Sequence, residues 1–177
     1  MTQRGGRLKR MLLFAIYGGM MFAAKVAMEA LPNIHPVTML TMTFAVVYGF
    51  RALVPVYIYV LLDGLFHGFG VWWLPYTYIW ALYCVITALL PKNMKRSLAA
   101  VLYPALCALF GLCFGALYAP AQAALFRLDF ASTAAWVAAG LPFDAIHAAG
   151  NLGFGLLILP LSEALKKLHR AAGIPLK

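Results

Sequence analysis

Apolar residues along this chain gather into six stretches, separated by short breaks that contain proline, glycine or charged residues. Stretches of this length and character are typical of helices that cross a membrane. The predicted spans cover residues 11–31, 37–50, 52–66, 72–90, 98–118 and 134–165. The pattern therefore predicts an all-α membrane protein, a compact bundle of six transmembrane helices that forms a single membrane domain over residues 1–177.

Composition supports this prediction. Of the 177 residues, 64% are hydrophobic and 11% are charged, whereas soluble domains carry about 25% charged residues. The mean hydropathy is +0.87, so we expect the lipid bilayer to be the environment of the chain. The formal net charge of +9 does not indicate nucleic-acid binding, because the basic residues stand in short runs between apolar stretches, as in loops that face the cytoplasm.

The placement of the charges predicts the orientation of the bundle. Lys and Arg gather in four places: at the N-terminus (Arg4, Arg7, Lys9, Arg10), at Arg51, in one loop (Lys92, Lys95, Arg96) and at the C-terminus (Lys166, Lys167, Arg170, Lys177). Four of the five acids fall on or toward the opposite side, namely Glu29, Asp63, Asp129 and Asp144. Because short cytoplasmic loops are rich in Lys and Arg, both termini are expected in the cytoplasm.

A polar stripe opens the last apolar stretch. On a helix Asp144, His147 and Asn151 lie at i, i+3 and i+7, so they share one face. Polar side chains in a segment suited to lipid must face protein, water or a ligand. Pro142 suits the first turn of this helix, where its missing N–H costs nothing. The stripe is therefore either part of a binding site or a polar contact that joins helices.

Other polar and aromatic residues are expected at the same, outward end. The candidate ligand-binding residues are Asn33, His35, Asp63, His67, Trp72, Trp73, Tyr76, Gln122, Asp144, His147 and Asn151. A channel usually carries polar groups along its whole depth, whereas here they concentrate at one end, like a cup that opens outward. Taken singly, the histidines also fit loops and the aromatics fit an interfacial belt. Lys25 and Glu29, at i and i+4, are expected to pair near the same surface.

Small residues form a smooth face on the first predicted span. Ala15, Gly19 and Ala23 lie at i, i+4 and i+8, a spacing that lets another helix approach closely. Gly18 and Ala27 extend this surface, so it is a candidate face for docking a partner, with internal packing as the alternative. Gly111 and Gly115 form a second small pair, which we expect to be internal.

Motifs for catalysis and metal binding are missing from the sequence. The three cysteines, Cys84, Cys107 and Cys113, lie inside apolar stretches without CxxC spacing, so we assign them no disulfide or metal. There is no Gly-x-Ser-x-Gly, no His-Glu-x-x-His and no Gly-x-x-x-x-Gly-Lys-Ser/Thr motif. We therefore assign no catalytic residue and no cofactor. Two alternatives stay open: a small intramembrane enzyme that uses Asp144 and His147 as acid and base, and a stand-alone solute carrier.

Taken together, these features resemble the substrate-binding (S) components of energy-coupling factor (ECF) transporters, a type of ABC transporter. The shared features are about six helices in fewer than 200 residues, cytoplasmic termini and a small-xxx-small first helix. The stretches Pro-Asn-Ile-His-Pro-Val-Thr (residues 32–38) and Gly-Leu-Pro-Phe-Asp (residues 140–144) are also similar to this family. The family's Ala-x-x-x-Ala motif falls on Ala15 and Gly19 or on Gly19 and Ala23.

This resemblance implies a function and partners. The chain would be the vitamin- or micronutrient-binding subunit of an uptake transporter in a prokaryotic plasma membrane. It would capture its ligand in an outward-facing pocket and work with a transmembrane coupling protein and two cytoplasmic ATPases. Nickel and cobalt members begin Met-His, whereas this chain begins Met1-Thr2-Gln3, which argues against metal transport. The aromatic cluster favours a ring-containing vitamin such as cobalamin, a flavin or a folate.

Overall fold

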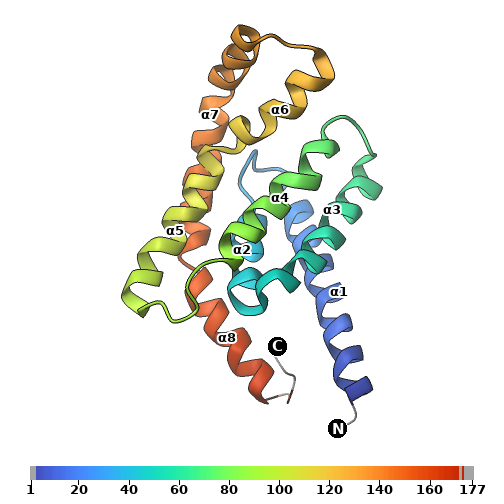
Figure 1. The fold of residues 1–177 in the computed structure, drawn as a ribbon, viewed down its shortest axis with the longest axis vertical. Helices are drawn as coiled ribbons and strands as arrows, with labels where there is room; N and C mark the ends of the chain where they lie inside the picture. Colours follow the sequence, from blue (N-terminus) through green and yellow to red (C-terminus); the bar gives the residue numbers. More distant parts are fainter. Residues whose placement is uncertain (1–2, 172, 174–177) are drawn as a thin grey trace.

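The computed structural model describes residues 3–171 and 173, and regular secondary structure in this part of the chain is helical throughout (Figure 1). The elements are α1 (Gln3–Ala27), α2 (Val37–Tyr48), the 3-10 helix η1 (Gly49–Ala52), α3 (Leu53–His67), α4 (Trp73–Ala88), α5 (Arg96–Leu112), α6 (Phe114–Phe126), α7 (Phe130–Gly155) and α8 (Ile158–Ala171). The all-α prediction is confirmed. Met1, Thr2 and Lys177, which entered the sequence arguments, lie outside the described residues.

The helices form an elongated bundle in which α3 and α4 run in opposite directions, as do α6 and α7, whereas α5 continues into α6 and α7 continues into α8 (Figure 1). α3 and α4 make an antiparallel hairpin, in which the Trp73 indole N–H donates to the Val60 carbonyl at 2.8 Å. The predicted spans correspond to α1, α2, α3, α4, α5 with α6, and α7 with α8. The start of α1 and the end of α8 lie at the same end of the bundle.

Several helices are suited to a membrane. Three helical stretches in the described residues are long and apolar enough to cross one: Gly6–Ala27, Val37–His67 and Arg96–Phe126. A fourth arises if α7 and α8, which are bent by 44°, count as one span. Many large apolar side chains also remain exposed, including Val101 and Phe130. These features are consistent with a multi-pass membrane protein, while six crossings and their orientation stay predictions.

The last predicted span, residues 134–165, is not one continuous helix. The chain breaks after Gly155, and α8 begins at Ile158. Pro160 explains the break, because proline lacks an N–H and its ring clashes with the carbonyl four residues earlier, here Leu156. The helix also begins earlier than expected, at Phe130, so Pro142 lies inside α7 and not in its first turn. Asp129 sets that start by accepting the Ser132 backbone N–H at 2.8 Å, a bond that lowers the pKa of Asp129.

The fifth predicted span, residues 98–118, also differs from the structure. α5 ends at Leu112, and α6 begins at Phe114 and continues to Phe126 through a segment that the sequence left as a connection. α6 departs from the line of α5 in Figure 1. At the junction, the Gly115 N–H donates to both carboxylate oxygens of Asp144, each at 3.1 Å. Asp144 on α7 thus satisfies an N–H in the first turn of α6, which otherwise has no partner within the helix.

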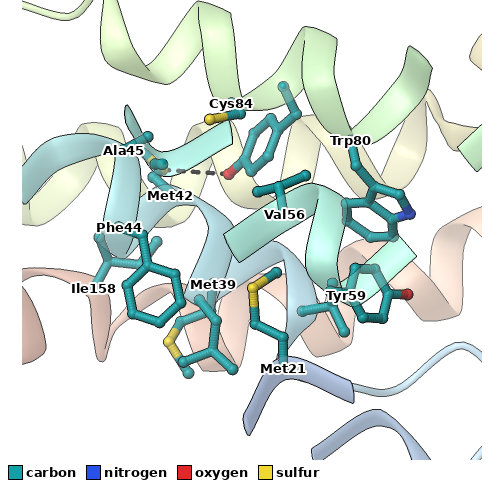
Figure 2. Packing of buried hydrophobic residues seen from close by; sticks show 14 of the residues in the cluster. Met21, Met39, Met42, Phe44, Ala45, Val56, Tyr59, Trp80, Cys84 and Ile158 are labelled. Atoms are coloured by element: carbon teal, nitrogen blue, oxygen red, sulfur yellow. Dashed lines mark hydrogen bonds between the residues drawn. The ribbon is translucent and has the colours of Figure 1, made fainter. Parts of the chain in front are cut away.

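The core surrounds α2. Every residue of this helix except Val46 is buried, as expected for a helix that is apolar all round. Met42 and Phe44 of α2 pack among Met21, Val56 and Ile158 from the surrounding helices (Figure 2). The antiparallel pair α5 and α7 flanks this core, and Gly111 and Gly155 allow the two helices to approach closely.

Candidate functional site

The polar stripe of α7 faces the interior. Asp144, His147 and Asn151 are 7%, 3% and 1% exposed, and with Gly155 they are the buried residues of this helix. Their spacing places them on one face, and that face lies against α5 and the start of α6. Asn151 and His147 lie against Gly111, and Asp144 lies against Gly115.

Four rings surround the middle of this stripe. The His147 ring lies 5.2 Å from the His35 ring and 5.0 Å from the Phe114 ring, measured between centroids. Trp80 lies 6.3 Å from His35 and 5.8 Å from Phe114. Tyr59 stands beside Trp80 at 5.8 Å, as Figure 2 shows. The loop before α2 and four helices, α3, α4, α6 and α7, therefore converge on one place.

Several polar atoms in this place are buried and have no hydrogen-bond partner among the described residues. They are His35 Nδ1, His147 Nε2, Trp80 Nε1, the Tyr59 hydroxyl, and Nδ2 and Oδ1 of Asn151. Most buried polar atoms in proteins have a partner, so each exception requires an explanation. We call His35, Tyr59, Trp80, His147 and Asn151 the central polar cluster.

His35 lies in the loop before α2, and its pKa is lowered to about 3. Burial is the largest cause, and the neighbouring His147 and Lys25 lower the pKa further. The imidazole is therefore neutral at neutral pH, with one nitrogen that donates and one that accepts. The central polar cluster thus offers both hydrogen-bond donors and hydrogen-bond acceptors.

Asp144 has a structural partner. Its carboxylate accepts the Gly115 N–H through both oxygens. No hydrogen bond joins Asp144 to His147 among the residues that the structure describes. These two side chains therefore do not form a hydrogen-bonded acid–base pair. Asp144 links α7 to the junction of α5 and α6.

Lys25 and Asp63 form a second polar group, and the partner of Lys25 differs from the one that the sequence predicted. The Lys25 ammonium lies 2.6 Å from a carboxylate oxygen of the fully buried Asp63, so the predicted pair with Glu29 is wrong. Glu29 instead lies 2.5 Å from Nε2 of His67. The reason is that α1 ends at Ala27, so Glu29 is no longer one helical turn above Lys25.

Two aromatic residues that the sequence predicted for the binding site lie against this ion pair. The Lys25 ammonium lies 5.7 Å from the centre of a Trp72 ring and 5.3 Å from that of Tyr76, distances typical of cation–π contacts. Tyr76 also packs against Trp80 at 5.8 Å. The ion pair and the central polar cluster are thus neighbours, joined through Tyr76.

Besides Asp144, three of the residues predicted for the site stand outside both groups. Trp73 donates its N–H to Val60 and holds the hairpin of α3 and α4 together. Asn33 is half-buried in the loop before α2 and has a positive φ of 58°, a conformation that Asn tolerates better than most residues. Gln122 is half-buried on α6.

Sequence reasoning missed Trp80, Tyr59 and Lys25 as parts of these groups. The sequence could have indicated Trp80, because Trp72, Tyr76 and Trp80 lie at i, i+4 and i+8 and so share one face of α4. No sequence pattern could have shown the contacts of Lys25 and Tyr59, since their partners come from helices far away in the sequence. Within residues 3–171 and 173, no group of three or more His, Cys, Asp or Glu is placed to hold a metal ion.

Comparisons of this chain with protein-family models, with curated proteins and with solved structures gave no match.

Proposed function

We propose that this chain is the substrate-binding component of an ECF-type uptake transporter and captures a vitamin or related micronutrient in the plasma membrane of a prokaryote. The central polar cluster is the observation that carries this proposal. Its donors and acceptors are buried without partners, and they lie among the rings of Trp80, Phe114 and Tyr59.

The energetics of the cluster favour a ligand. A buried polar group without a partner costs roughly 1–3 kcal/mol, and the Asn151 amide alone leaves both of its heteroatoms unpaired. A ligand that carries ring donors and acceptors would satisfy these groups while its faces pack on the aromatic side chains. This combination of polar and aromatic groups favours a planar, nitrogen-containing ring.

The outer face of α1 supports a docking role. Ala15 and Ala23 are exposed, and a Cβ added to Gly19 would meet no atom within 4 Å. Gly18, one residue away, packs inward: an added Cβ would lie 2.5 Å from Ile58 Cγ2. The earlier expectation that Gly18 extends the smooth surface is therefore wrong. Ala15, Gly19 and Ala23 form a stripe that is free for a helix of the coupling protein.

The ligand test begins with the purified protein. Native mass spectrometry of material prepared in mild detergent is expected to reveal a bound small molecule, which fragmentation then identifies. Asn151→Ala and His35→Ala should each weaken its binding by about 5- to 150-fold, the equivalent of one lost buried hydrogen bond. Ser162→Ala is the matched control, because Ser162 also has a buried hydroxyl without a partner among the described residues but stands on α8, which contributes no residue to the central polar cluster. Unchanged affinity in both folded variants would contradict the proposed site.

The partner test compares two neighbouring glycines. Gly19→Leu is expected to leave folding and ligand binding intact, while co-purification with the coupling protein and the ATPases is lost. Gly18→Leu should instead unfold the protein, because it inserts a side chain between α1 and α3. Normal assembly and uptake with Gly19→Leu and with Ala15→Leu would rule out this face as the interface. Uptake by the purified chain alone in vesicles would favour the stand-alone carrier.

A further inference from the structure

A second site lies at the end of the bundle where α1 starts and α8 ends. It is a cavity of about 360 Å³, formed by the end of α2, η1, the end of α4, the loop after it, α5 and α8. Ligand sites in proteins begin at about 300 Å³, so the cavity is large enough for a small polar group. None of the residues of the central polar cluster lines it.

Three cationic side chains line this cavity, and they come from three separate segments. Arg51 belongs to η1, Lys92 to the loop between α4 and α5, and Lys166 to α8. No Asp or Glu is among the lining residues. In the described part of the chain, the ion pairs of Glu163, Asp63 and Glu29 go to other residues. Among the described residues, the lining of the cavity therefore carries a net positive charge.

Contacts within the fold hold one of these cations, Lys166, at the cavity. The Tyr48 hydroxyl lies 2.7 Å from Nε2 of the buried His169 and also donates to the Tyr17 hydroxyl at 3.1 Å. These contacts tie α8 to the middle of α1 and to the end of α2. Lys166 lies one helical turn before His169, so the same contacts hold it at the cavity. Tyr48 also lines the cavity itself.

Apolar residues also line the cavity and adjoin it. Its wall includes Val46, Ala88 and Leu90, and the neighbouring Phe50 and Leu89 are 53% and 68% exposed. In a membrane protein, exposed side chains of this kind at a helix end face lipid. The cavity thus places positive charge beside a lipid-facing surface.

We propose that this cavity binds the phosphate of an anionic phospholipid headgroup. Arg51 supplies a planar fork of N–H donors that matches phosphate oxygens, and Lys92 and Lys166 supply two further charges. Basic cavities between transmembrane helices bind lipid headgroups in the same way. A free phosphate would satisfy the cations equally, but it would leave the adjoining apolar surface unused. The site is independent of the function proposed above.

The experiment measures lipid retention by the full chain. The protein is reconstituted in phosphatidylcholine nanodiscs with and without phosphatidylglycerol, extracted in a zwitterionic detergent and analysed by native mass spectrometry. The wild type should retain phosphatidylglycerol in preference to phosphatidylcholine. The triple variant Arg51→Gln, Lys92→Gln and Lys166→Gln should retain it at least about ten-fold less, because each charge near a lipid surface contributes a several-fold preference.

A matched triple variant is the control. Lys9→Gln, Lys95→Gln and Lys167→Gln removes the same charge from exposed positions outside the cavity, and it should retain the lipid as the wild type does. Arg51→Lys keeps the charge but loses the fork, so intermediate retention is expected, with unchanged thermal unfolding as the check on folding. Equal loss in both triple variants, or no preference in the wild type, would overturn the proposal. Displacement of the lipid by millimolar inorganic phosphate would identify a free-anion site and would also overturn it.

Discussion

At the residue scale, the buried polar groups of this protein fall into two kinds. Lys25 with Asp63, and Asp144 with the Gly115 N–H, are paired within the structure. His35 and Asn151 carry buried atoms without partners. Paired groups hold helices together, whereas unpaired ones are costly unless something else satisfies them. This difference separates structural residues from candidate ligand contacts on the same helices.

The first residue-scale prediction concerns the ion pair of Lys25 and Asp63. Asp63→Leu leaves the Lys25 ammonium without its counter-ion, so the free energy of unfolding should fall by about 3–5 kcal/mol. The double variant Lys25→Met and Asp63→Leu replaces both charges by apolar groups and should recover most of that loss. Unfolding in detergent, followed by circular dichroism, measures both changes. A double variant as unstable as the single one would contradict this assignment.

The second residue-scale prediction concerns the response of His35 to pH. Its pKa is about 3 in the folded protein and about 6.5 when unfolded, so the unfolded chain binds more protons between these values. Stability is therefore fully present above pH 6.5 and is lost as the pH falls toward 3. The unfolding temperature of the wild type should drop between pH 7 and 5. In the His35→Gln variant this position cannot titrate, so the drop in unfolding temperature should be smaller. A drop equal to that of the wild type would show that other groups cause the effect.

At the element scale, the close contact of α5 with α7 depends on glycine. Gly111 packs against the backbone of α7, where an added Cβ would lie 2.9 Å from the Ala148 backbone nitrogen and 2.9 Å from the His147 carbonyl carbon. Backbone atoms cannot move aside as flexible side chains do, so any larger residue must push the helices apart. The same contact positions His147 and Asn151, because both lie where α7 meets Gly111.

A pair of glycine substitutions tests this contact. Gly111→Ala should lower the free energy of unfolding by about 1–3 kcal/mol through overpacking. Gly153→Ala is the matched control on α7, where an added Cβ meets no atom within 4 Å. It should stabilise the protein by up to about 1 kcal/mol, because alanine favours helix over glycine. Equal effects of the two substitutions, measured by chemical unfolding, would show that α5 and α7 are not in close contact.

At the scale of the whole molecule, the charges divide the bundle into two ends. The loop between α4 and α5, which holds Lys92, lies toward the end where α1 starts (Figure 1), and Arg51 lines the same cavity as Lys92. The loop of Asp129 lies at the opposite end, where α6 meets α7 (Figure 1). Basic residues gathered at one end of the bundle are what the predicted orientation, with both termini in the cytoplasm, would give.

Cysteine labelling in intact cells tests the orientation. In a chain whose native cysteines are replaced by alanine, Asn93→Cys should be protected from an impermeant thiol reagent, because its loop is predicted to face the cytoplasm. Arg127→Cys, in the loop between α6 and α7, should be labelled. Permeabilised cells, in which both positions should react, provide the control. The reverse pattern of labelling would overturn the orientation.

The sequence by itself determined the class of the protein, the positions of most helices and the shared face of Asp144, His147 and Asn151. These features follow from local periodicity and composition, because a helix places residues three, four and seven apart on one side whatever surrounds it. The proline-rich break at residues 32–36 was visible for the same reason, since proline restricts its own residue and the one before it.

The tertiary structure decided which polar groups meet. Lys25 pairs with Asp63 and not with Glu29, and Asp144 accepts the Gly115 N–H. Both contacts join helices that are distant in sequence, so helix packing and not local spacing brings the partners together. His35, Trp80 and Tyr59 joined the stripe of α7 in the same way. A sequence shows which side chains share a face of one helix. Only the packing of several helices decides which faces meet, and so which buried atoms are paired and which have no partner.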